Sequence, residues 1–365
     1  MTMKLLTPVK VGALNLSNRI VMAPLTRSRA GQPGNVPTDS NVEYYAQRAG
    51  AGLIVSEASQ VSQQGQGYAW TPGMYSDEQE AGWKKVVAAV HAKGGRMSAQ
   101  LWHVGRISHP LLQENGAAPV APSAIQAVTT KCFPVQPDGT ASFVPCGMPR
   151  ALLTEEMPGI VAQYRQAAVR AKRAGFDFVE VHAANGYLLQ QFLATNTNQR
   201  TDQYGGSLAN RARLLLEVID AVIEVMGAER VGIRMSPHFS FNDIDDAETE
   251  PMTLYLAKEL SQRGVTYLHI AEPGWVGGPA YSDDFRRQLR AAFTGTLICC
   301  GGYTSQSGEK LLKDGLADAI AFGRMFIANP DLVDRIRQGA VLNTPDQKTF
   351  YGGGAAGYTD YPTLT

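Results

Sequence analysis

The chain carries no excess charge, because its 33 lysines and arginines balance 33 aspartates and glutamates in 365 residues. A nucleic-acid or anionic-membrane partner usually selects for a surplus of basic residues, so neither partner is expected. Long apolar runs are also missing, and none approaches the ~20 residues that cross a bilayer. Since the N-terminus has no signal-peptide pattern, the sequence predicts a cytoplasmic protein without a membrane anchor.

Cysteine and histidine are scarce. The four cysteines, Cys132, Cys146, Cys299 and Cys300, form no CxxC motif, which favours reduced thiols. The six histidines are single and widely spaced, so no metal site is expected. Apolar residues make up 44% of the chain, which predicts a compact globular protein.

Eight short apolar runs alternate with amphipathic segments along the chain. The amphipathic segments repeat their apolar residues with helical spacing, as between Trp83 and Val90. Thr154 is placed to begin one helix as its N-cap, and Gly175 to end it. Strands that alternate with helices form a parallel sheet, so the pattern predicts an α/β fold, a single (β/α)8 TIM barrel over residues 1–365. The runs cover residues 19–22, 53–57, 96–101, 178–182, 231–235, 267–271, 296–300 and 319–322.

The repeat is interrupted by one long excursion, residues 102–153, after the third strand. This stretch is rich in Pro and Gly, and Asp138-Gly139 between two β-like runs predicts a hairpin. In a barrel, the excursion leaves the C-terminal ends of the strands, where active sites lie. We therefore expect a lid or pocket wall that is inserted within the single domain.

The most informative run is the fourth strand with its continuation, DFVEVHAANGY. Period-two alternation places Glu180 and His182 on the inner face of the barrel, because the valines between them suit the helix layer. Asn185 and Tyr187 follow within five residues. An imidazole and a carboxamide at one point can hold a carbonyl or nitro oxygen, and a phenol beside them can supply a proton. The alternative is that His182 and Asn185 only hold the loop in place and that Tyr187 only packs against its neighbours.

Arginines and glycines lie at the C-terminal ends of three later strands. Arg234 on the fifth strand faces the barrel mouth, where its guanidinium suits an electron-rich ring or an oxyanion. The alternative is an ion pair with the inward Glu180, which would not exclude such a function. The seventh and eighth strands end in glycines, and the loops after these strands commonly bind phosphate in barrels. The expected phosphate ligands are Gly301, Gly302, Gly323 and Arg324.

Six motifs together resemble one family, the FMN-dependent old yellow enzymes, and in particular its bacterial N-ethylmaleimide, nitrate-ester and morphinone reductases. The resemblance covers essentially the whole chain, and the joint occurrence of the motifs is highly specific. They are NRIVMAPLTRSRA at 18–30, YYAQRAGAGLIVSEA at 44–58, AQLWHVGR at 99–106, VEVHAANGYLLQQFL at 179–193, NQRTDQYGGSLANRARLLLEV at 198–218 and AFGRMFIANPDLV at 321–333.

The resemblance implies FMN as a tightly bound, noncovalent cofactor across the barrel mouth. It assigns the hydroxyl of Thr26 to the O4/N5 edge of the isoalloxazine and the cation of Arg234 to N1 and O2. The positions that match FMN-binding residues of the family are Ala23, Pro24, Thr26, Ala58, Gln100, Arg234, Gly301, Gly302, Gly323 and Arg324.

The resemblance also implies an NAD(P)H-dependent reaction. NADPH or NADH, with NADPH favoured, reduces the flavin, and flavin N5 passes a hydride to the β-carbon of an activated alkene such as an enone or a maleimide. Nitrate esters and nitroaromatics are related acceptors. His182 and Asn185 hold the substrate oxygen, and Tyr187 protonates the α-carbon. The expected pocket walls are Tyr68, Trp102, Trp275 and Tyr351.

Two other functions stay open. A glycoside hydrolase is a rival because Glu57, Glu180 and Glu272 lie on or after strands, although such enzymes need two carboxyl groups ~5–9.5 Å apart across the sugar and the seventh strand supplies none. A noncatalytic flavin-binding protein would keep FMN but would not need Tyr187. The expected partners are small electrophilic molecules, and the sequence allows a monomer or a homodimer.

Overall fold

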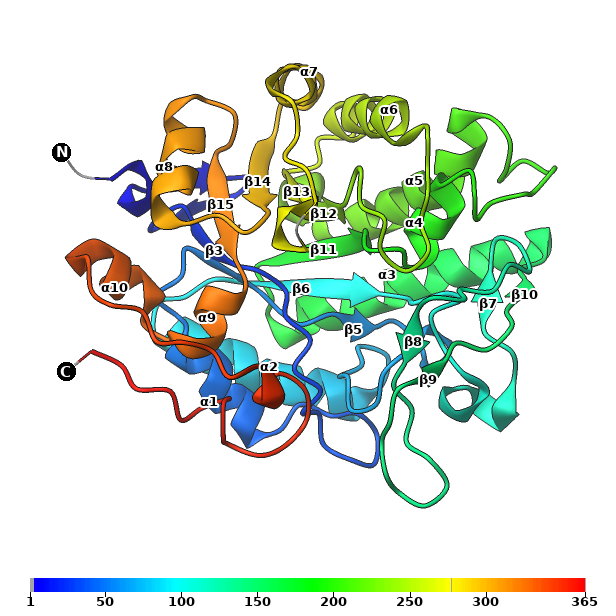
Figure 1. Ribbon diagram of the computed structural model, residues 1–365, viewed down its shortest axis with the longest axis horizontal. Helices are drawn as coiled ribbons and strands as arrows, with labels where there is room; N and C mark the ends of the chain where they lie inside the picture. The colour runs from blue at the N-terminus through cyan, green and yellow to red at the C-terminus, as the bar shows by residue number, and fades with distance from the viewer. Residues whose placement is uncertain (1–2, 277, 365) are drawn as a thin grey trace.

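Eight parallel strands close into a barrel at the centre of the molecule (Figure 1). The computed structural model describes residues 3–276 and 278–364, except for the side chain of Trp275. Each barrel strand pairs with the next in chain order, and the last pairs with the first. All eight coincide with the predicted runs, which confirms the (β/α)8 barrel. They are β3 (Ile20–Met22), β4 (Leu53–Val55), β6 (Met97–Trp102), β11 (Phe178–Ala183), β12 (Val231–Met235), β13 (Tyr267–Ala271), β14 (Thr296–Cys300) and β15 (Ala319–Phe322).

Helices follow the strands and cover the outside of the barrel. In Figure 1, α1 and α2 lie on one side of the strands, and α6, α7 and α8 lie on the other. Gly175 ends α3 as predicted, at a φ of 93° that glycine adopts without strain. The helices are α1 (Asp39–Gln47), α2 (Asp77–Ala92), α3 (Met157–Ala174), α4 (Leu188–Leu193), α5 (Leu208–Met226), α6 (Thr249–Gln262), α7 (Asp283–Ala292), α8 (Ser305–Lys313), α9 (Arg324–Ala328) and α10 (Leu332–Gln338).

Three further observations concern the cysteine thiols, membrane-spanning helices and metal-binding clusters. All four cysteines are buried and carry free thiols. Among residues 3–276 and 278–364, no helix combines the length and the apolar character that crossing a bilayer requires. In the same residues, no three His, Cys, Asp or Glu side chains gather where they could hold a metal ion.

Alternation along the strands divides the apolar core into two layers. Val179 and Val181 of β11 pack outward against the helices. Phe178 of the same strand faces the barrel interior, where its ring meets that of Tyr267 edge-on at 6.1 Å. Because both faces of each strand are buried, the strands are apolar nearly throughout. A polar residue that faces inward therefore differs from most of its neighbours in the core.

A short hairpin covers the N-terminal end of the barrel. Strands β1 (Val9–Val11) and β2 (Leu14–Leu16) pair antiparallel, and their side chains join the interior core. The turn needs Gly12, at φ 50°, because a Cβ there would lie 2.0 Å from the carbonyl oxygen of Glu229. With this end covered, the site belongs at the C-terminal ends of the strands.

Residues 103–153 leave β6 at the C-terminal end of the barrel. Within them, β8 (Lys131–Cys132) pairs antiparallel with β9 (Val144–Pro145). The turn between these strands holds Gly139 at a φ of 84°, where the sequence placed a hairpin. Strand β7 (Val120–Ala121) then pairs with β10 (Arg150–Ala151), which returns the chain toward α3.

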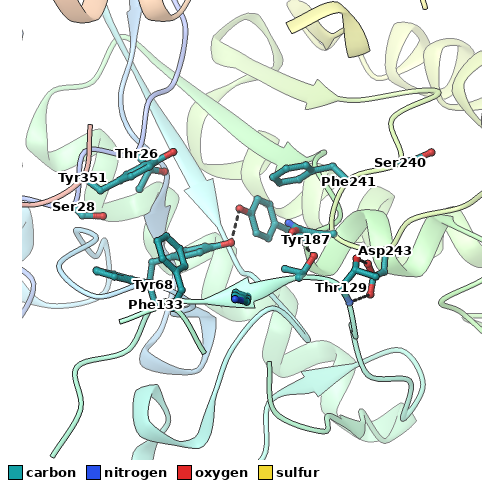
Figure 2. A pocket seen from close by; sticks show the side chains of 14 residues that line it. Thr26, Ser28, Tyr68, Thr129, Phe133, Tyr187, Ser240, Phe241, Asp243 and Tyr351 are labelled. Atoms are coloured by element: carbon teal, nitrogen blue, oxygen red, sulfur yellow. Dashed lines mark hydrogen bonds between the residues drawn. The ribbon is translucent and has the colours of Figure 1, made fainter. Parts of the chain in front are cut away.

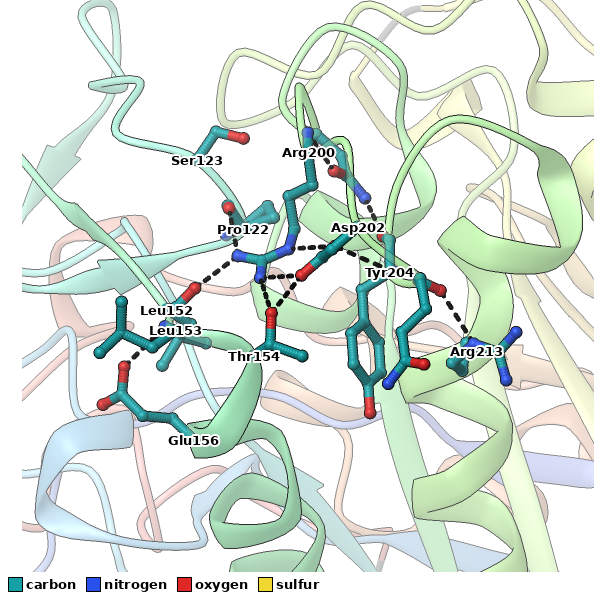
Figure 3. A network of polar contacts seen from close by, with 12 residues as sticks. Pro122, Ser123, Leu152, Leu153, Thr154, Glu156, Arg200, Asp202, Tyr204 and Arg213 are labelled. Atoms are coloured by element: carbon teal, nitrogen blue, oxygen red, sulfur yellow. Dashed lines mark hydrogen bonds and ion pairs between the residues drawn. The ribbon is translucent and has the colours of Figure 1, made fainter.

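Arg200, in the loop after α4, anchors this excursion (Figure 3). Its guanidinium donates to the carbonyl oxygens of Pro122 and Leu152 and pairs with Asp202, and the pairing lowers the pKa of the Asp202 carboxyl. Thr154 donates its hydroxyl to the same carboxylate. The prediction of Thr154 as N-cap was wrong: a 3-10 turn comes first and α3 begins three residues later. The Thr154 hydroxyl is hydrogen-bonded to Asp202, a residue distant in the sequence, and does not cap α3.

Candidate active site

A cavity of about 500 Å³ opens at the C-terminal end of the barrel (Figure 2). Thr26 and Ser28 reach it from the segment after β3, and Tyr187 reaches it from the segment after β11. The loop after β12 contributes residues 240–243, and the excursion contributes Phe133. Four residues predicted from the sequence therefore meet at one cavity: Thr26, Tyr68, Tyr187 and Tyr351.

Tyr187 lies in the inner wall of this cavity, 8% exposed, with its phenolic oxygen 3.3 Å from that of Tyr68. Burial raises the pKa of Tyr187 to about 12, and the hydrogen bond with Tyr68 opposes part of that rise. The phenol is therefore protonated at neutral pH, as a proton donor must be. Trp102 lies behind both rings: it stacks on Tyr68 at 5.8 Å and meets Tyr187 edge-on at 4.9 Å. Trp102 was expected to line the pocket. It packs instead behind the two tyrosines that line it.

His182, near the end of β11, faces inward beside Tyr187, with the two rings edge-on at 5.2 Å. Its Nδ1 is buried and has no hydrogen-bond partner among the described residues. Burial, helped by the charge of Arg234, lowers the pKa of His182 to about 3. The imidazole is therefore neutral and can donate one hydrogen bond to a ligand.

Asn185 follows in a tight turn with φ 57°, a left-handed conformation that asparagine tolerates. Its backbone is fixed on both sides: its N–H donates to the Ser236 hydroxyl at 2.7 Å, and its carbonyl accepts from Asn242 at 2.8 Å. The side-chain Oδ1 is buried without a partner in the described chain. The turn therefore holds an amide whose oxygen has no partner, three residues after His182 in the sequence; of the predicted trio, Tyr187 lines the cavity, whereas His182 and Asn185 are not among the lining residues of the described chain.

Gln100 and Arg234 belong to a chain of buried polar groups inside the barrel. Nε2 of Gln100 donates to Glu180 at 2.7 Å, and Nδ1 of His269 lies 3.0 Å from the second oxygen of that carboxylate. Nη1 of Arg234 lies 3.1 Å from Nε2 of His269. The alternative of an Arg234–Glu180 ion pair was wrong, because His269 stands between them. Period-two alternation places His269 inside the barrel but does not show what it meets.

The predicted phosphate ligands lie at the ends of β14 and β15, which are neighbours in the sheet. Gly302 adopts a φ of 80°, so glycine is required in this turn. Arg324 is exposed at the start of α9. The loop is braced by Tyr303, whose hydroxyl donates to Glu272 at 2.6 Å.

The three glutamates of the rival hypothesis are committed to separate buried partners. Glu57 accepts from the backbone N–H of Arg27 at 3.2 Å, and burial raises its pKa to about 7. Glu272 makes a bidentate pair with Arg286 at 2.9 and 2.5 Å. Glu180 is held by Gln100 and His269. No two of these carboxylates share the cavity described above.

The remaining predicted contacts are more scattered. Ala23 is buried in the interior core, Ala58 is buried in the cluster behind the cavity, and Pro24 is half-buried, more exposed than either alanine. Tyr351 reaches the cavity rim from the C-terminal segment and is 57% exposed. The side chain of Trp275 lies outside the described residues.

Sequence reasoning missed the loop after β12. Phe241 lines the cavity, and the carboxylate of Asp243 accepts from the backbone N–H groups of Val128 at 2.5 Å and Thr129 at 3.0 Å. Asp243 thus ties this loop to the excursion, in Figure 2 beside the cavity. The available signal was the run HFSFNDIDD at 238–246, in which aromatic and turn residues directly follow the end of a barrel strand.

Buried polar atoms without partners test whether these residues fit a flavin, since such atoms need an explanation. Nε of Arg234, Nδ1 of His182 and Nε1 of Trp102 are three of them in the described chain. His182 and Arg234 are register partners on β11 and β12, and the rings of His182 and Trp102 both contact Tyr187. A planar heterocycle with several carbonyl and ring-nitrogen atoms offers partners for such groups, so the residues fit an isoalloxazine.

The chain is similar to flavin-dependent reductases over its whole length. Residues 4–343 match the profile of the NADH:flavin oxidoreductase / NADH oxidase family. The fold superposes on morphinone reductase in complex with tetrahydroNAD with a TM-score of 0.96 and 58% identity, over 99% of this chain and 98% of that one. An old yellow enzyme homologue from Zymomonas mobilis gives a TM-score of 0.93 at 41% identity, over 99% and 100% of the two chains. The 12-oxophytodienoate reductase 1 of Oryza sativa subsp. japonica is 45% identical over 365 residues, 99% of this chain and 93% of that protein.

These matches confirm the resemblance to the old yellow enzymes and lend no support to a glycoside hydrolase. They also favour an enzyme over a noncatalytic flavin carrier, because the related proteins are reductases. The chain belongs to the NADH:flavin oxidoreductase / NADH oxidase family and is an NAD(P)H-dependent flavin oxidoreductase with FMN as its cofactor.

Proposed function

We propose that this enzyme reduces C=C bonds activated by a neighbouring carbonyl group, as in enones and maleimides, and that nitrate esters and nitroaromatics are further acceptors. One juxtaposition carries the proposal: the neutral ring of His182 meets Tyr187, a protonated phenol in the cavity wall, edge-on at 5.2 Å, and the turn that follows His182 holds Asn185, whose buried Oδ1 has no partner in the described chain. Two donors and one acid are what the reduction of an unsaturated carbonyl compound requires.

FMN, when bound, supplies the hydride chemistry that links NADPH or NADH to the substrate. Gln100 and Arg234 would hold the pyrimidine part of its ring, because Arg234 has a buried Nε without a partner in the described chain. The ring would lie against Ala23, Pro24, Thr26 and Ala58, and the phosphate would lie on Gly301, Gly302, Gly323 and Arg324.

His182 and Asn185 would bind the oxygen that activates the substrate. Because His182 is neutral, its hydrogen bond strengthens as negative charge develops on that oxygen without the cost of burying another charge. Two donors aimed at this charge contribute about 3–6 kcal/mol, judged from the loss of single donors in other oxyanion sites. This polarisation makes the β-carbon electrophilic.

Tyr187 would deliver the proton to the α-carbon. Its pKa of about 12 keeps the proton available at neutral pH, and the hydroxyl of Tyr68 at 3.3 Å can stabilise the phenolate that remains. The aromatic rings of Tyr68, Phe133 and Phe241 line the cavity, which favours flat, cyclic substrates. The excursion, residues 102–153, would act as a lid over these substrates.

Three finer points stay predictions. The morphinone reductase complex with tetrahydroNAD supports a nicotinamide cofactor as the reductant, whereas a preference for NADPH over NADH follows only from the resemblance. The enzyme is proposed to act in the cytoplasm, as a monomer or a homodimer.

Anaerobic flavin titration tests the proposal directly. The purified protein should be yellow, lose its visible absorption on addition of NADPH or NADH, and regain it with 2-cyclohexenone or N-ethylmaleimide. The double variant His182→Ala/Asn185→Ala should keep FMN but lose the charge-transfer band that phenols give with the wild type. Reoxidation by oxygen alone, with no alkene or nitro compound reduced, would overturn the proposed substrates.

A further inference from the structure

Four polar residues from adjacent strands form an unbroken hydrogen-bonded chain beneath the barrel mouth. Gln100, Glu180, Arg234 and His269 stand on β6, β11, β12 and β13, which pair in that order. Their exposures are 1%, 0%, 6% and 0%. The contacts are 2.7 Å from Gln100 to Glu180, 3.0 Å from Glu180 to His269 and 3.1 Å from His269 to Arg234. So much buried polarity in a barrel core requires a reason.

The donors and acceptors along this chain can be assigned in only one order. A carboxylate only accepts, so Nδ1 of His269 must carry a proton and donate it to Glu180. A guanidinium only donates, and Nη1 of Arg234 lies 3.1 Å from Nε2 and 3.5 Å from Nδ1 of the same ring, so it contacts the ring where Nε2 carries no proton. Burial and the charge of Arg234 lower the pKa of His269, so the ring is neutral.

The same reasoning fixes the amide of Gln100. A carboxylate only accepts, so the Nε2 of Gln100 faces Glu180 and Oε1 must point away from it. Burial alone would raise the pKa of Glu180, but His269, Arg234 and Gln100 together hold it below its ordinary value. The carboxylate is therefore ionised and organises both neighbours.

Arg234 is tethered at one end only. Its Nη1 is held by His269, its Nη2 makes a weak contact with the Cys300 thiol at 3.9 Å, and its Nε is buried without a partner in the described chain. The tether therefore aims the guanidinium while leaving donors for a ligand.

We propose that Glu180 and His269 are positioning residues for FMN: Glu180 orients Gln100 as a hydrogen-bond acceptor, and His269, as the neutral Nδ1–H tautomer, aims Arg234 as a donor. An isoalloxazine carries an imide, whose N–H donates and whose carbonyl oxygens accept, so an acceptor and a donor side by side match it. The inference rests on the proposed contact of FMN with Gln100 and Arg234.

The substitution Glu180→Gln tests this arrangement because it keeps the shape and reverses one donor. Its new amide N–H would face the N–H of His269, and moving that proton to Nε2 would bring it against Arg234. If the new N–H faces Gln100 instead, that amide must turn so that Oε1 accepts from it and Nε2 faces the ligand. In the first case the contact that positions Arg234 is disturbed, and in the second Gln100 presents a donor to FMN where an acceptor is needed. The matched control is Asp177→Asn, which alters a buried carboxylate at the opposite end of the barrel, hydrogen-bonded to Met97 and His91.

We expect Glu180→Gln to weaken FMN binding by about ten- to a hundredfold, the range for one or two lost hydrogen bonds to a charged group. Affinity should fall further for reduced than for oxidised FMN, because Arg234 faces the charge of the reduced ring. An extra tenfold loss would lower the midpoint potential of bound FMN by about 30 mV. Both quantities are measured by titration of the apoprotein and by dye-coupled reduction. Asp177→Asn should change neither.

Three outcomes would overturn the inference. Unchanged affinity and potential would make the chain a purely structural feature, and an equal loss in Asp177→Asn would make the effect one of stability. A raised potential with unchanged affinity for oxidised FMN would make Glu180 only a countercharge to Arg234. If Glu180→Gln does not fold, 15N-histidine spectra of the wild-type holoenzyme decide: His269 must be the Nδ1–H tautomer from pH 5.5 to 8.5. Failure of the proposed function is separate, since it would appear as wild-type protein that takes up no FMN or reduces no alkene.

Discussion

The phenolic oxygens of Tyr187 and Tyr68 lie 3.3 Å apart in a wall that Trp102 supports from behind. Burial makes Tyr187 a weak acid, and the second phenol makes it a slightly stronger one. A group that must give up a proton in an apolar wall needs such a partner, because the phenolate left behind is otherwise poorly solvated. The pair therefore carries two predictions.

Removing the proton donor should separate the two halves of the reaction. In Tyr187→Phe, reduction of the enzyme by NADPH should be normal, because that half needs no proton from this residue. Reoxidation by 2-cyclohexenone should slow by about 10²–10⁴-fold, the usual contribution of a positioned acid. Anaerobic stopped-flow measurement of each half checks this. Equal rates of reoxidation in the variant and the wild type would assign proton delivery to water or to another residue.

Removing the supporting phenol should have a smaller effect on the same step. Tyr68→Phe should slow reoxidation by about ten- to a hundredfold, because the phenolate loses one hydrogen bond to its charge. In the Tyr187→Phe background the same substitution should have no effect, since no phenolate then forms. The double-mutant cycle distinguishes this coupling from a change in cavity shape, which would slow the reaction in both backgrounds.

The alkene half-reaction should be insensitive to pH between 6 and 9. Burial lowers the pKa of His182 to about 3, so the ring is neutral above that value, and burial raises the pKa of Tyr187 to about 12, so the phenol is protonated below it. Asn185 does not titrate in this range. Stopped-flow rates of reoxidation across this range check the prediction, and a unit-slope inflection would place a different group in the site.

The barrel could be predicted from the sequence because strand and helix periods are local properties. His182 and Arg234 could be placed on its inner face for the same reason, by counting residues along one strand. Contacts between strands are not local: His269 is single in the sequence, and only the register of β12 against β13 brings it to Arg234. The direct Arg234–Glu180 pair was wrong for this reason.

The residues that line the cavity could likewise be predicted only where a sequence motif surrounds them. Tyr68, Tyr187 and Tyr351 were identified through the motifs around them, whereas Phe133, Phe241 and the Asp243 tether belong to loops without a regular period. Thr154 was misassigned because a loop residue, Asp202, accepts its hydroxyl. Loop contacts depend on the assembled fold, so residues on or directly after barrel strands could be placed from the sequence better than loop residues that line the cavity.

A glycine inside the barrel should be more critical for stability than one on its outside. A Cβ at Gly232 would lie 2.1 Å from the buried ring of Tyr267, so Gly232→Ala should lower the free energy of unfolding by about 1–3 kcal/mol or more through overpacking. The control is Gly159→Ala in α3, where a Cβ meets nothing within 4 Å and better helix propensity should add up to about 1 kcal/mol. Urea unfolding of the two holoenzymes gives both values. Similar stabilities would show that the Tyr267 ring can move aside.

The tether between the loop after β12 and the excursion should govern substrate binding more than chemistry. Asp243 accepts from Val128 and Thr129, and both segments line the cavity, so Asp243→Ala should free one wall from the other. We expect amide exchange over residues 128–133 to rise and KM for 2-cyclohexenone to increase several-fold, with FMN content unchanged. Asp138→Ala is the matched control, because Asp138 lies at the tip of the same excursion and contacts only its neighbour Thr140 through its carboxylate. If both variants raise KM alike, loosening the hairpin anywhere is sufficient and the tether has no special role. If neither does, the excursion does not close over the substrate, and the aromatic walls bind it without a lid.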